Sequence, residues 1–414
     1  MKKSYLSLSL SAIVITGVIA ISSIGCAKKP KVVDYQPLFP ESTMISGYRN
    51  FQAECTNAVV RDFNTIFKEK IEQLWSICET EPEGLKAKKS FDEAYAMYSE
   101  EFPKLIGLTA GDYRWLAFSM GDISVPLGEP ENITMPDMTV VLYTAKPVDP
   151  IALVEGGRKL FLDEIKKDFK DLDVDNATFD EFLAEAEKVA SFEKTEWNGR
   201  PAVRLIIKDE DIKESLLNFS PILTQIGDGR LLVLASNRSS LEEIEGVYAG
   251  TVKPLAKDSA IVSTLEKSKG SLAFFAFPKI DKWIAKTIPA EGLTADSLEE
   301  PMDLVVGLKA LFVEIGTQGD SIYTDYKVVF NNEMLAKKLE AYFNMGKSFI
   351  SLAIPSEIPD PSLQPLALDF IDKISATTSG GEFKIRLPVS SSLLKKINVF
   401  SFVKMLGESA DDEE

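Results

Sequence analysis

Short apolar stretches separated by turn signals alternate with longer stretches of helical periodicity along most of the chain. Residues 113–122 and 138–149 are rich in aromatic and β-branched side chains, which predicts strands. Residues 55–78 instead carry apolar side chains three or four positions apart, from Val59 to Cys78, which predicts one long helix. We therefore expect a protein that combines helices with sheets.

Turn and capping residues mark where these elements begin and end. Asp149 followed by Pro150 is typical of a helix start, because Asp accepts from free N–H groups and Pro lacks the N–H that would otherwise be unpaired. Ser239 and Glu242 have the spacing of a capping box, and a further helix is expected to begin at Asn331 or Asn332. Turns that contain glycine predict four hairpins, at Asn198-Gly199, Gly227-Asp228-Gly229, Gly319-Asp320 and Gly380-Gly381.

The order strand, helix, strand, strand, helix, strand is found twice, starting near residue 43 and again near residue 271. This is the split βαβ order of ferredoxin-like domains. The predicted fold class is thus α+β, with two tandem ferredoxin-like (βαββαβ) repeats, mainly antiparallel sheets and added helices. Few residues match between the copies, and two unrelated α+β domains or one large domain stay open as alternatives.

Residues 1–25 have the features of an export signal: two lysines near the start, an uncharged apolar run, and small residues before Cys26. The stretch Ser23-Ile24-Gly25-Cys26 resembles the lipobox of bacterial lipoproteins, with Ser23 where Leu is usual. In that family the signal is cleaved before the cysteine, whose thiol receives a diacylglycerol and whose new N-terminus is acylated. The resemblance implies a lipidated Cys26 and a membrane-lipid anchor.

By the same resemblance, the protein is expected in the bacterial cell envelope, anchored on the periplasmic side. Ala27 stands where Asp often marks inner-membrane retention, so the outer membrane is favoured over the inner one. Cleavage by an ordinary signal peptidase, which would give a soluble secreted protein, stays open, as does retention of the apolar run as an anchor. The predicted segments are a signal peptide 1–25, a lipidated cysteine and tether 26–42, a first α+β domain 43–256, a second α+β domain 257–406, and an acidic disordered tail 407–414.

Composition limits the partners and the kinds of catalytic or metal site that this chain can have. The 414 residues carry a formal net charge of −17, which becomes −19 once loss of residues 1–25 removes two lysines and no acid. Such a surface repels nucleic acid, so no nucleic-acid partner is expected. Histidine is absent, which excludes Ser–His and Cys–His nucleophile pairs and His-ligated zinc. With no complete catalytic or cofactor motif in the chain, we predict no catalytic residue, no cofactor and no metal site.

Two short motifs have plainer explanations than chemistry. The aspartates within 171–175 are spaced as in a calcium-binding EF-hand loop, but the loop's required Gly and final Glu are missing. Ser392 and Lys395 have the spacing of a Ser-x-x-Lys nucleophile, but the partner motifs of that enzyme class come in the wrong order, and Ser392 is expected to cap a helix.

Three functional classes remain. The favoured one is a membrane-anchored envelope lipoprotein that acts as a non-catalytic binding or scaffold protein, with an envelope protein as its partner. The alternatives are a carrier of a lipid or other apolar ligand in the cell envelope, and a carboxylate- or Ser/Lys-dependent hydrolase.

Cys55 and Cys78 lie at the ends of a predicted helix about 34 Å long, so two buried thiols are expected in place of a disulfide.

The lipobox resemblance predicts the mass of the mature protein. Protein extracted from native membranes should lack residues 1–25 and carry acyl groups on Cys26, because cleavage follows lipidation in that family. A Cys26→Ala variant should retain its signal, and intact-mass spectrometry of both proteins is the measurement. An unmodified Cys26, or cleavage after Ala27, would contradict the lipoprotein interpretation.

Overall fold

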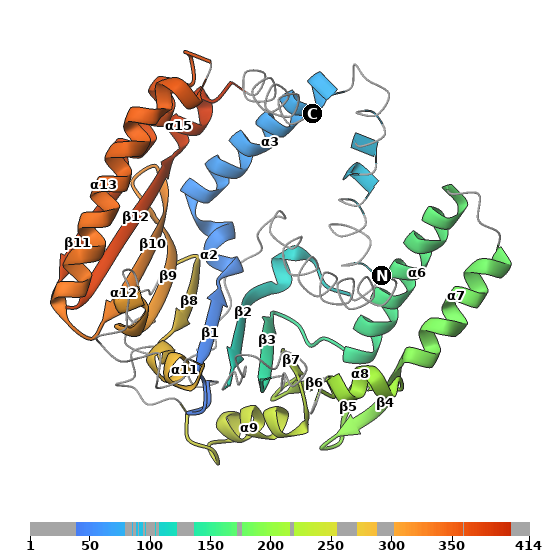
Figure 1. Cartoon of the computed structure of the whole chain (residues 1–414). Coiled ribbons are helices and arrows are strands. Elements are labelled where there is room, and N and C mark those ends of the chain that lie inside the picture. Colours follow the sequence, from blue (N-terminus) through green and yellow to red (C-terminus); the bar gives the residue numbers. More distant parts are fainter. Residues whose placement is uncertain are drawn as a thin grey trace. The chain divides into compact units, whose positions relative to one another are not determined.

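A computed structural model of the chain (Figure 1) describes residues 39–78, 107–121, 136–171, 176–215, 219–254, 271–287, 302–358 and 360–398, with isolated positions between 85 and 104. Helices and antiparallel strands are both abundant among them, so the α+β class is confirmed. The predicted signal peptide, Cys26, most of the tether and the acidic tail lie outside the described residues. Contacts group the described residues into two compact units, unit 1 from 1–43 and 91–256, and unit 2 from 44–90 and 257–414.

The described residues of unit 1 form six strands, and each pair of neighbours among them is antiparallel. Their order in the sheet is β2 (Tyr113–Met120), β3 (Met138–Thr144), β7 (Leu231–Ala235), β6 (Ile222–Ile226), β5 (Arg200–Ile207) and β4 (Ala190–Trp197). The described helices of this unit are η4 (Ala110–Asp112), α6 (Pro150–Asp171), α7 (Asn176–Val189), α8 (Glu210–Ser215) and α9 (Arg238–Ala249).

Local sequence signals explain several of these boundaries. The Asp149 carboxylate accepts from the Ile151 N–H at 2.9 Å, which confirms the predicted start of α6. Asn198 and Gly199 both have positive φ, as a type I′ turn between β4 and β5 requires. The capping box at Ser239 was a wrong prediction. Asn237 caps α9 instead, because its extended backbone lets its side-chain oxygen accept from the Ser240 N–H at 2.9 Å.

In the described part of unit 2 there are also six strands, again with antiparallel neighbours. Their order is β1 (Ile45–Arg49), β8 (Ala273–Phe277), β9 (Leu308–Gln318), β10 (Ser321–Phe330), β12 (Glu382–Ser390) and β11 (Ser375–Ser379). Its described helices are α2 (Phe51–Thr56), α3 (Ala58–Cys78), α11 (Ile280–Thr287), α12 (Met302–Val306), α13 (Glu333–Glu357), α14 (Gln364–Lys373) and α15 (Ser391–Lys396).

The first strand and its helices differ from the prediction in two ways. The predicted first domain, 43–256, includes them, whereas β1 pairs with β8 and its contacts therefore lie with unit 2. The predicted single helix over 55–78 is broken at Asn57, whose extended backbone ends α2 and whose side chain accepts from the Val59 N–H at 2.9 Å to start α3. Cys55 is half-buried in α2, not fully buried as expected.

The tandem ferredoxin-like repeat is not confirmed. In the split βαβ arrangement, two strands joined by a helix are separated by a third strand. Here β8 and β9, joined through α11 and α12, pair directly with one another. Both units do share one motif. A hairpin is followed by a pair of helices, and a later strand then pairs with the second strand of that hairpin. The return strand is β7 beside β3 in unit 1 and β12 beside β10 in unit 2.

The apolar core of unit 2 lies between α13 and the sheet. Phe330, Ala336 and Phe383 are buried together, and the Phe343 ring of α13 meets the Phe383 ring at 6.1 Å in an edge-on contact. Alternation along β12 places Phe383 and Ile385 on this side and sends Lys384 and Arg386 to the other. The helix therefore fixes one face of β12 and leaves the charged face for other contacts.

This packing predicts a large difference between two Phe→Ala substitutions in unit 2. Phe383 is 1% exposed, so Phe383→Ala should lower the free energy of unfolding by about 3–5 kcal/mol through lost burial and a residual cavity. Phe349 on α13 is 64% exposed, and Phe349→Ala should change it by less than about 0.5 kcal/mol. Urea titration of both variants is the measurement, and equal losses would contradict the assigned core.

Candidate functional site

A buried carboxylate with two cationic partners lies on the charged face of unit 2's sheet. Asp325 of β10 is 4% exposed at its side chain. Arg386 of β12 donates to it twice, from Nε to Oδ1 and from Nη2 to Oδ2, each at 2.7 Å. The Lys384 ammonium lies 2.6 Å from Oδ2. Such a bidentate Arg–carboxylate pair with a second cation is among the stronger polar arrangements in proteins.

Strand register explains why these residues meet. Asp325 pairs with Arg386 across the β10–β12 ladder, and Lys384 is two residues from Arg386 on the same strand face. The Arg386 guanidinium also lies over the Tyr323 ring, 4.1 Å from its centroid, and donates to the Gln318 side-chain oxygen at 2.6 Å. These contacts hold the guanidinium in one orientation.

The electrostatics follow from burial and pairing. Burial tends to raise the pKa of Asp325, but hydrogen bonds from Arg386 and Lys384 more than offset this and leave that pKa below its usual value. The pKa of Arg386 is raised, chiefly by its hydrogen bonds to Asp325. Burial and the neighbouring Glu314 carboxylate raise the pKa of Tyr323. The Asp325 carboxylate is therefore held ionised beside these two basic side chains.

A small cavity of about 230 Å³ adjoins the two cations. It is lined by Ser375 and Thr377 of β11 and by Lys384 and Arg386 of β12. The Lys384 and Arg386 side chains are 40% and 30% exposed, so both are partly accessible to solvent. We refer to these four residues as the β11–β12 cavity.

The side chains that line the β11–β12 cavity have more hydrogen-bond donors than their contacts use. Arg386 has five N–H donors and uses three in the contacts above, while Lys384 has three and uses one. The hydroxyls of Ser375 and Thr377 add two more donors. Acceptors at the cavity are limited to those hydroxyls, since Asp325 is already shared between the two cations. The cavity is therefore suited to an anionic group.

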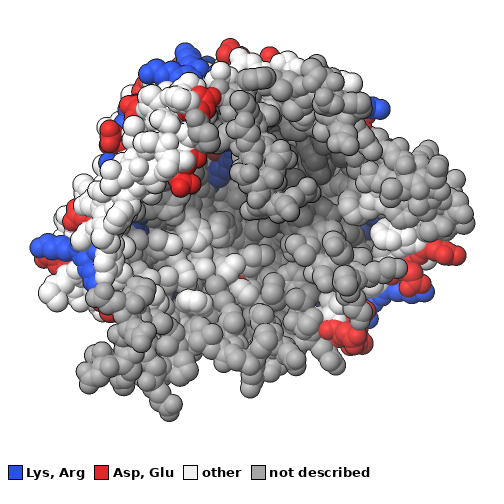
Figure 2. All heavy atoms as spheres, turned by 45° about the horizontal axis from the view of Figure 1, so that its top comes forward, with Lys and Arg blue, Asp and Glu red and all other residues white. Residues whose placement is uncertain are grey.

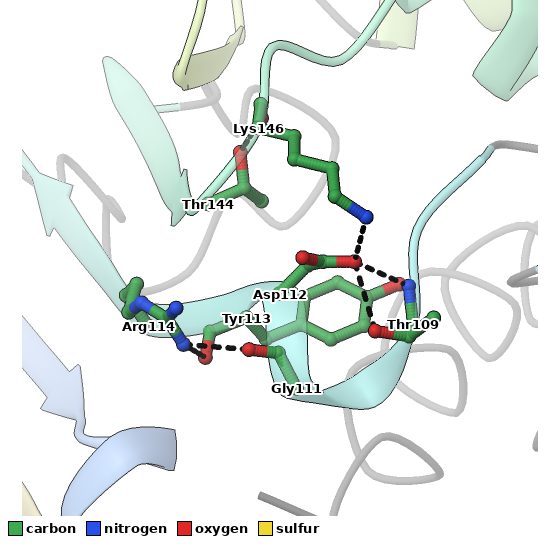
Figure 3. Close-up of polar contacts among 7 residues, drawn as sticks. All are labelled: Thr109, Gly111, Asp112, Tyr113, Arg114, Thr144 and Lys146. Atoms are coloured by element: carbon green, nitrogen blue, oxygen red, sulfur yellow. Dashed lines mark hydrogen bonds and ion pairs between the residues drawn. The ribbon is translucent and has the colours of Figure 1, made fainter. Parts of the chain in front are cut away.

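A second polar cluster, in unit 1, joins η4 to the end of β3 (Figure 3). The Asp112 carboxylate accepts from the backbone N–H and the hydroxyl of Thr109, both at 2.8 Å, and from the Lys146 ammonium at 2.9 Å. The Thr144 hydroxyl donates to the Lys146 carbonyl at 2.6 Å. Figure 3 shows that the two Thr109 groups and the Lys146 ammonium converge on one Asp112 oxygen. Arg114 points away and donates to the Gly111 carbonyl at 2.6 Å.

This second cluster stabilises the fold of unit 1. Burial tends to raise the pKa of Asp112, but the hydrogen bonds from Thr109 and Lys146 outweigh it and leave the pKa below its usual value. Burial and the Asp112 charge raise the pKa of Tyr113 to about 12. The donors around Asp112 come mostly from its own loop, so the cluster closes a turn.

Charge elsewhere on the described surface is mixed. On the face drawn in Figure 2, acidic and basic side chains of the described residues lie in small groups of both signs. Among the described residues, no group of three or more acidic or cysteine side chains could hold a metal ion. None of the helices in the described part of the chain has the length and apolar character needed to span a bilayer.

The structure describes some of the residues that were singled out from the sequence, and others lie outside its described part. Cys26 lies outside the described residues, so its lipidation stays a prediction. Ser392 is not the cap of α15. Ser390 caps it, accepting from the Leu393 N–H at 3.2 Å, and the Ser392 hydroxyl lies 2.9 Å from that of Ser390. Asp171 is the last residue of α6, and the rest of the EF-hand-like stretch before Asn176 is outside the described residues.

The Asp325 cluster was missed from sequence. Its members are about 60 residues apart, and only the strand register brings them together. One signal was present: charges at positions 382, 384 and 386 alternate with apolar residues in a predicted strand. That alternation indicates one charged sheet face but not the acidic partner it would meet.

No protein-family model and no curated protein matches the sequence. Among solved structures, crystal forms III, I and IV of TP0453 align with TM-scores of 0.34, 0.36 and 0.33. The identities are 9%, 8% and 9%, and the alignments cover 89%, 89% and 88% of this chain and 98%, 97% and 96% of those chains. TM-scores this low do not establish a shared fold, and the α+β class rests on the elements described above.

The Asp112 cluster predicts a pH-dependent loss of stability on substitution. Because its folded pKa is lowered, the carboxylate stabilises the fold above its unfolded pKa of about 3.9, and this contribution is lost as the pH falls through the folded value. Asp112→Asn should lower the free energy of unfolding at pH 7 by about 1–3 kcal/mol, and by progressively less below pH 4.

Denaturant titrations at pH 7, 5 and 3 measure this difference. Asp180→Asn, at an exposed position of α7, is the control and should match the wild type at every pH. An Asp112→Asn effect that is independent of pH would show that the carboxylate charge is not what stabilises the loop.

Proposed function

We propose that this chain is a membrane-anchored envelope lipoprotein, held through an acylated Cys26, that binds a partner without catalysis. The β11–β12 cavity receives an anionic group of that partner, a carboxylate or a phosphate. The observation that carries this proposal is the excess of charged donors at the cavity, in a protein whose overall charge is −17.

The chemistry around the cavity supports binding more than proton transfer. A general base needs a carboxylate or amine that can take up a proton near neutral pH. Asp325 is instead buried, doubly paired and held ionised by its partners, with its pKa lowered. The remaining side chains at the cavity present donors. Several fixed donors that face the same space without a matching acceptor are typical of an anion-binding site.

The size of the cavity sets the scale of the ligand group. Drug-sized ligands occupy pockets of roughly 300–1,000 Å³. A cavity of about 230 Å³ lined by four polar side chains is smaller than that range and fits a single side-chain-sized anionic group. This favours a group on a larger partner over the lipid or apolar ligand of the carrier alternative.

A matched pair of lysine variants tests the proposal. Lys384 and Lys373 are 40% and 42% exposed, and each lies beside one Asp carboxylate, but only Lys384 lines the cavity. We expect glutarate and inorganic phosphate to shift the backbone amide resonances of residues 375–386 in a saturable way. Lys384→Gln should weaken this binding about tenfold, because one charged hydrogen bond is lost, while Lys373→Gln leaves it unchanged.

The readout is a chemical-shift titration of the purified protein with each anion. Bidentate Arg386 still pairs with Asp325 in Lys384→Gln, so the sheet should keep its structure in that variant. Absence of saturable shifts with both anions, or equal weakening in the two variants, would rule out an anion site at β11–β12.

A further inference from the structure

The strand beside the cavity is an edge of unit 2's sheet. β11 is last in the strand order, and among the described residues it pairs with β12 alone (Figure 1). An edge strand presents a row of backbone N–H and C=O groups to which another chain can pair. The identity of the groups that point outward follows from the hairpin between β11 and β12.

The register of this hairpin identifies those groups. Ser379 pairs with Glu382 across the two-residue turn, and Gly380 has φ +57°, as the first position of a type II′ turn requires. A closing pair of this kind is hydrogen-bonded, and bonding then alternates along an antiparallel ladder. The backbone groups of Ser375, Thr377 and Ser379 therefore face β12, and those of Ala376 and Thr378 point away from the sheet.

The β11 edge is short, at five residues, but lacks other features that block strand addition. Its sequence, SATTS, has no charge and no proline, and its pairing with β12 has no bulge. The edge strand of unit 1, β4, is protected by contrast: Glu193, Lys194 and Glu196 are all exposed along it, and Lys194 forms an ion pair with Glu155.

The two faces of β11 have different surroundings. Thr378 donates from its hydroxyl to Glu340 of α13 at 2.6 Å, and Ala376 packs against the core under the same helix. Ser375, Thr377 and Ser379 are exposed on the opposite face, which is the face of Lys384 and Arg386. The edge is thus held rigidly from one side and open on the side of the cavity.

We propose, resting on the proposed function, that the partner is a protein that contributes an extended acidic segment, which adds to β11 as a further strand. Its backbone pairs with Ala376 and Thr378, and a carboxylate from its side chains enters the β11–β12 cavity. Neighbouring strands lie about 4.8 Å apart, so the cations of β12 are roughly 10 Å from an added strand. The small side chains of Ser375 and Thr377 leave that space open for a Glu and the Lys384 side chain to meet.

Backbone pairing and charge pairing can be tested separately. The probe is the fluorescent peptide TEVEVET, whose three Glu share one face of a strand, and TKVKVKT is its charge-reversed control. We expect saturable binding of TEVEVET, measured by fluorescence anisotropy, and none of TKVKVKT. Lys384→Gln should weaken binding of TEVEVET about tenfold, because it removes the cation that meets the carboxylate.

A proline at position 376 removes an outward N–H and keeps the bonds to β12, because proline is tolerated where the N–H faces away from the sheet. Ala376→Pro should weaken TEVEVET binding at least tenfold and leave glutarate binding unchanged. Glu196→Pro places proline at an outward-facing position of β4 and should bind the peptide like the wild type. Wild-type affinity in Ala376→Pro would overturn strand addition.

Amide hydrogen exchange of the wild type provides a test without mutation. Bound TEVEVET should slow exchange at Ala376 and Thr378, and unchanged exchange at both amides with the peptide bound would overturn the proposal. Glutarate distinguishes failure of strand addition from failure of the anion site. If glutarate binds but TEVEVET does not, strand addition is wrong and the anion site stands; if glutarate, phosphate and the peptide all fail to bind, the proposed function itself fails.

Discussion

The pairing of one buried carboxylate with two cations organises the charged face of unit 2. An ionised Asp325 inside the sheet surface would be costly without partners, because transfer of a charge from water into a low-dielectric environment is opposed by several kcal/mol. Arg386 and Lys384 offset that cost, and the pairing holds their side chains next to the edge strand β11 with unused donors. The cavity beside β11 follows from this pairing, since Ser375 and Thr377 are too small to fill the space next to the two long cations.

Asp112 shows what the same residue type does when its surroundings differ. Both aspartates are buried, and hydrogen bonds lower the pKa of each. At Asp112 the partners are a backbone N–H and a hydroxyl three residues away and one lysine, so the carboxylate closes its own loop. At Asp325 the partners come from another strand and keep unused donors. Local pairing stabilises a turn, whereas pairing across the sheet creates a surface with binding capacity.

Several elements governed by local physics were predictable from the sequence, although the caps expected at Ser239 and Ser392 were wrong. Arrangements governed by long-range pairing were not predictable. The Asp149 cap, the Asn332 helix start and the 198–199 turn depend on residues within four positions of one another, and all are found. The ferredoxin-like topology failed because element order does not determine which strands become neighbours. The meeting of Asp325 with Arg386 likewise depends on register between distant strands. The break at Asn57 was missed because apolar periodicity continues through it, while an Asn side chain can end one helix and start the next.

The protein's overall charge adds a constraint on how an acidic partner could be recognised. At physiological ionic strength, interactions between exposed charges are largely screened beyond about 8 Å. A net charge of −17 therefore gives an acidic segment no long-range attraction, and the favourable contacts arise only within reach of Lys384 and Arg386. Recognition by charge alone would be weak in this setting. Alignment of a backbone along the neutral β11 edge would supply the remaining affinity and would position the carboxylate, which is why the edge strand and the cavity are best understood as parts of one surface.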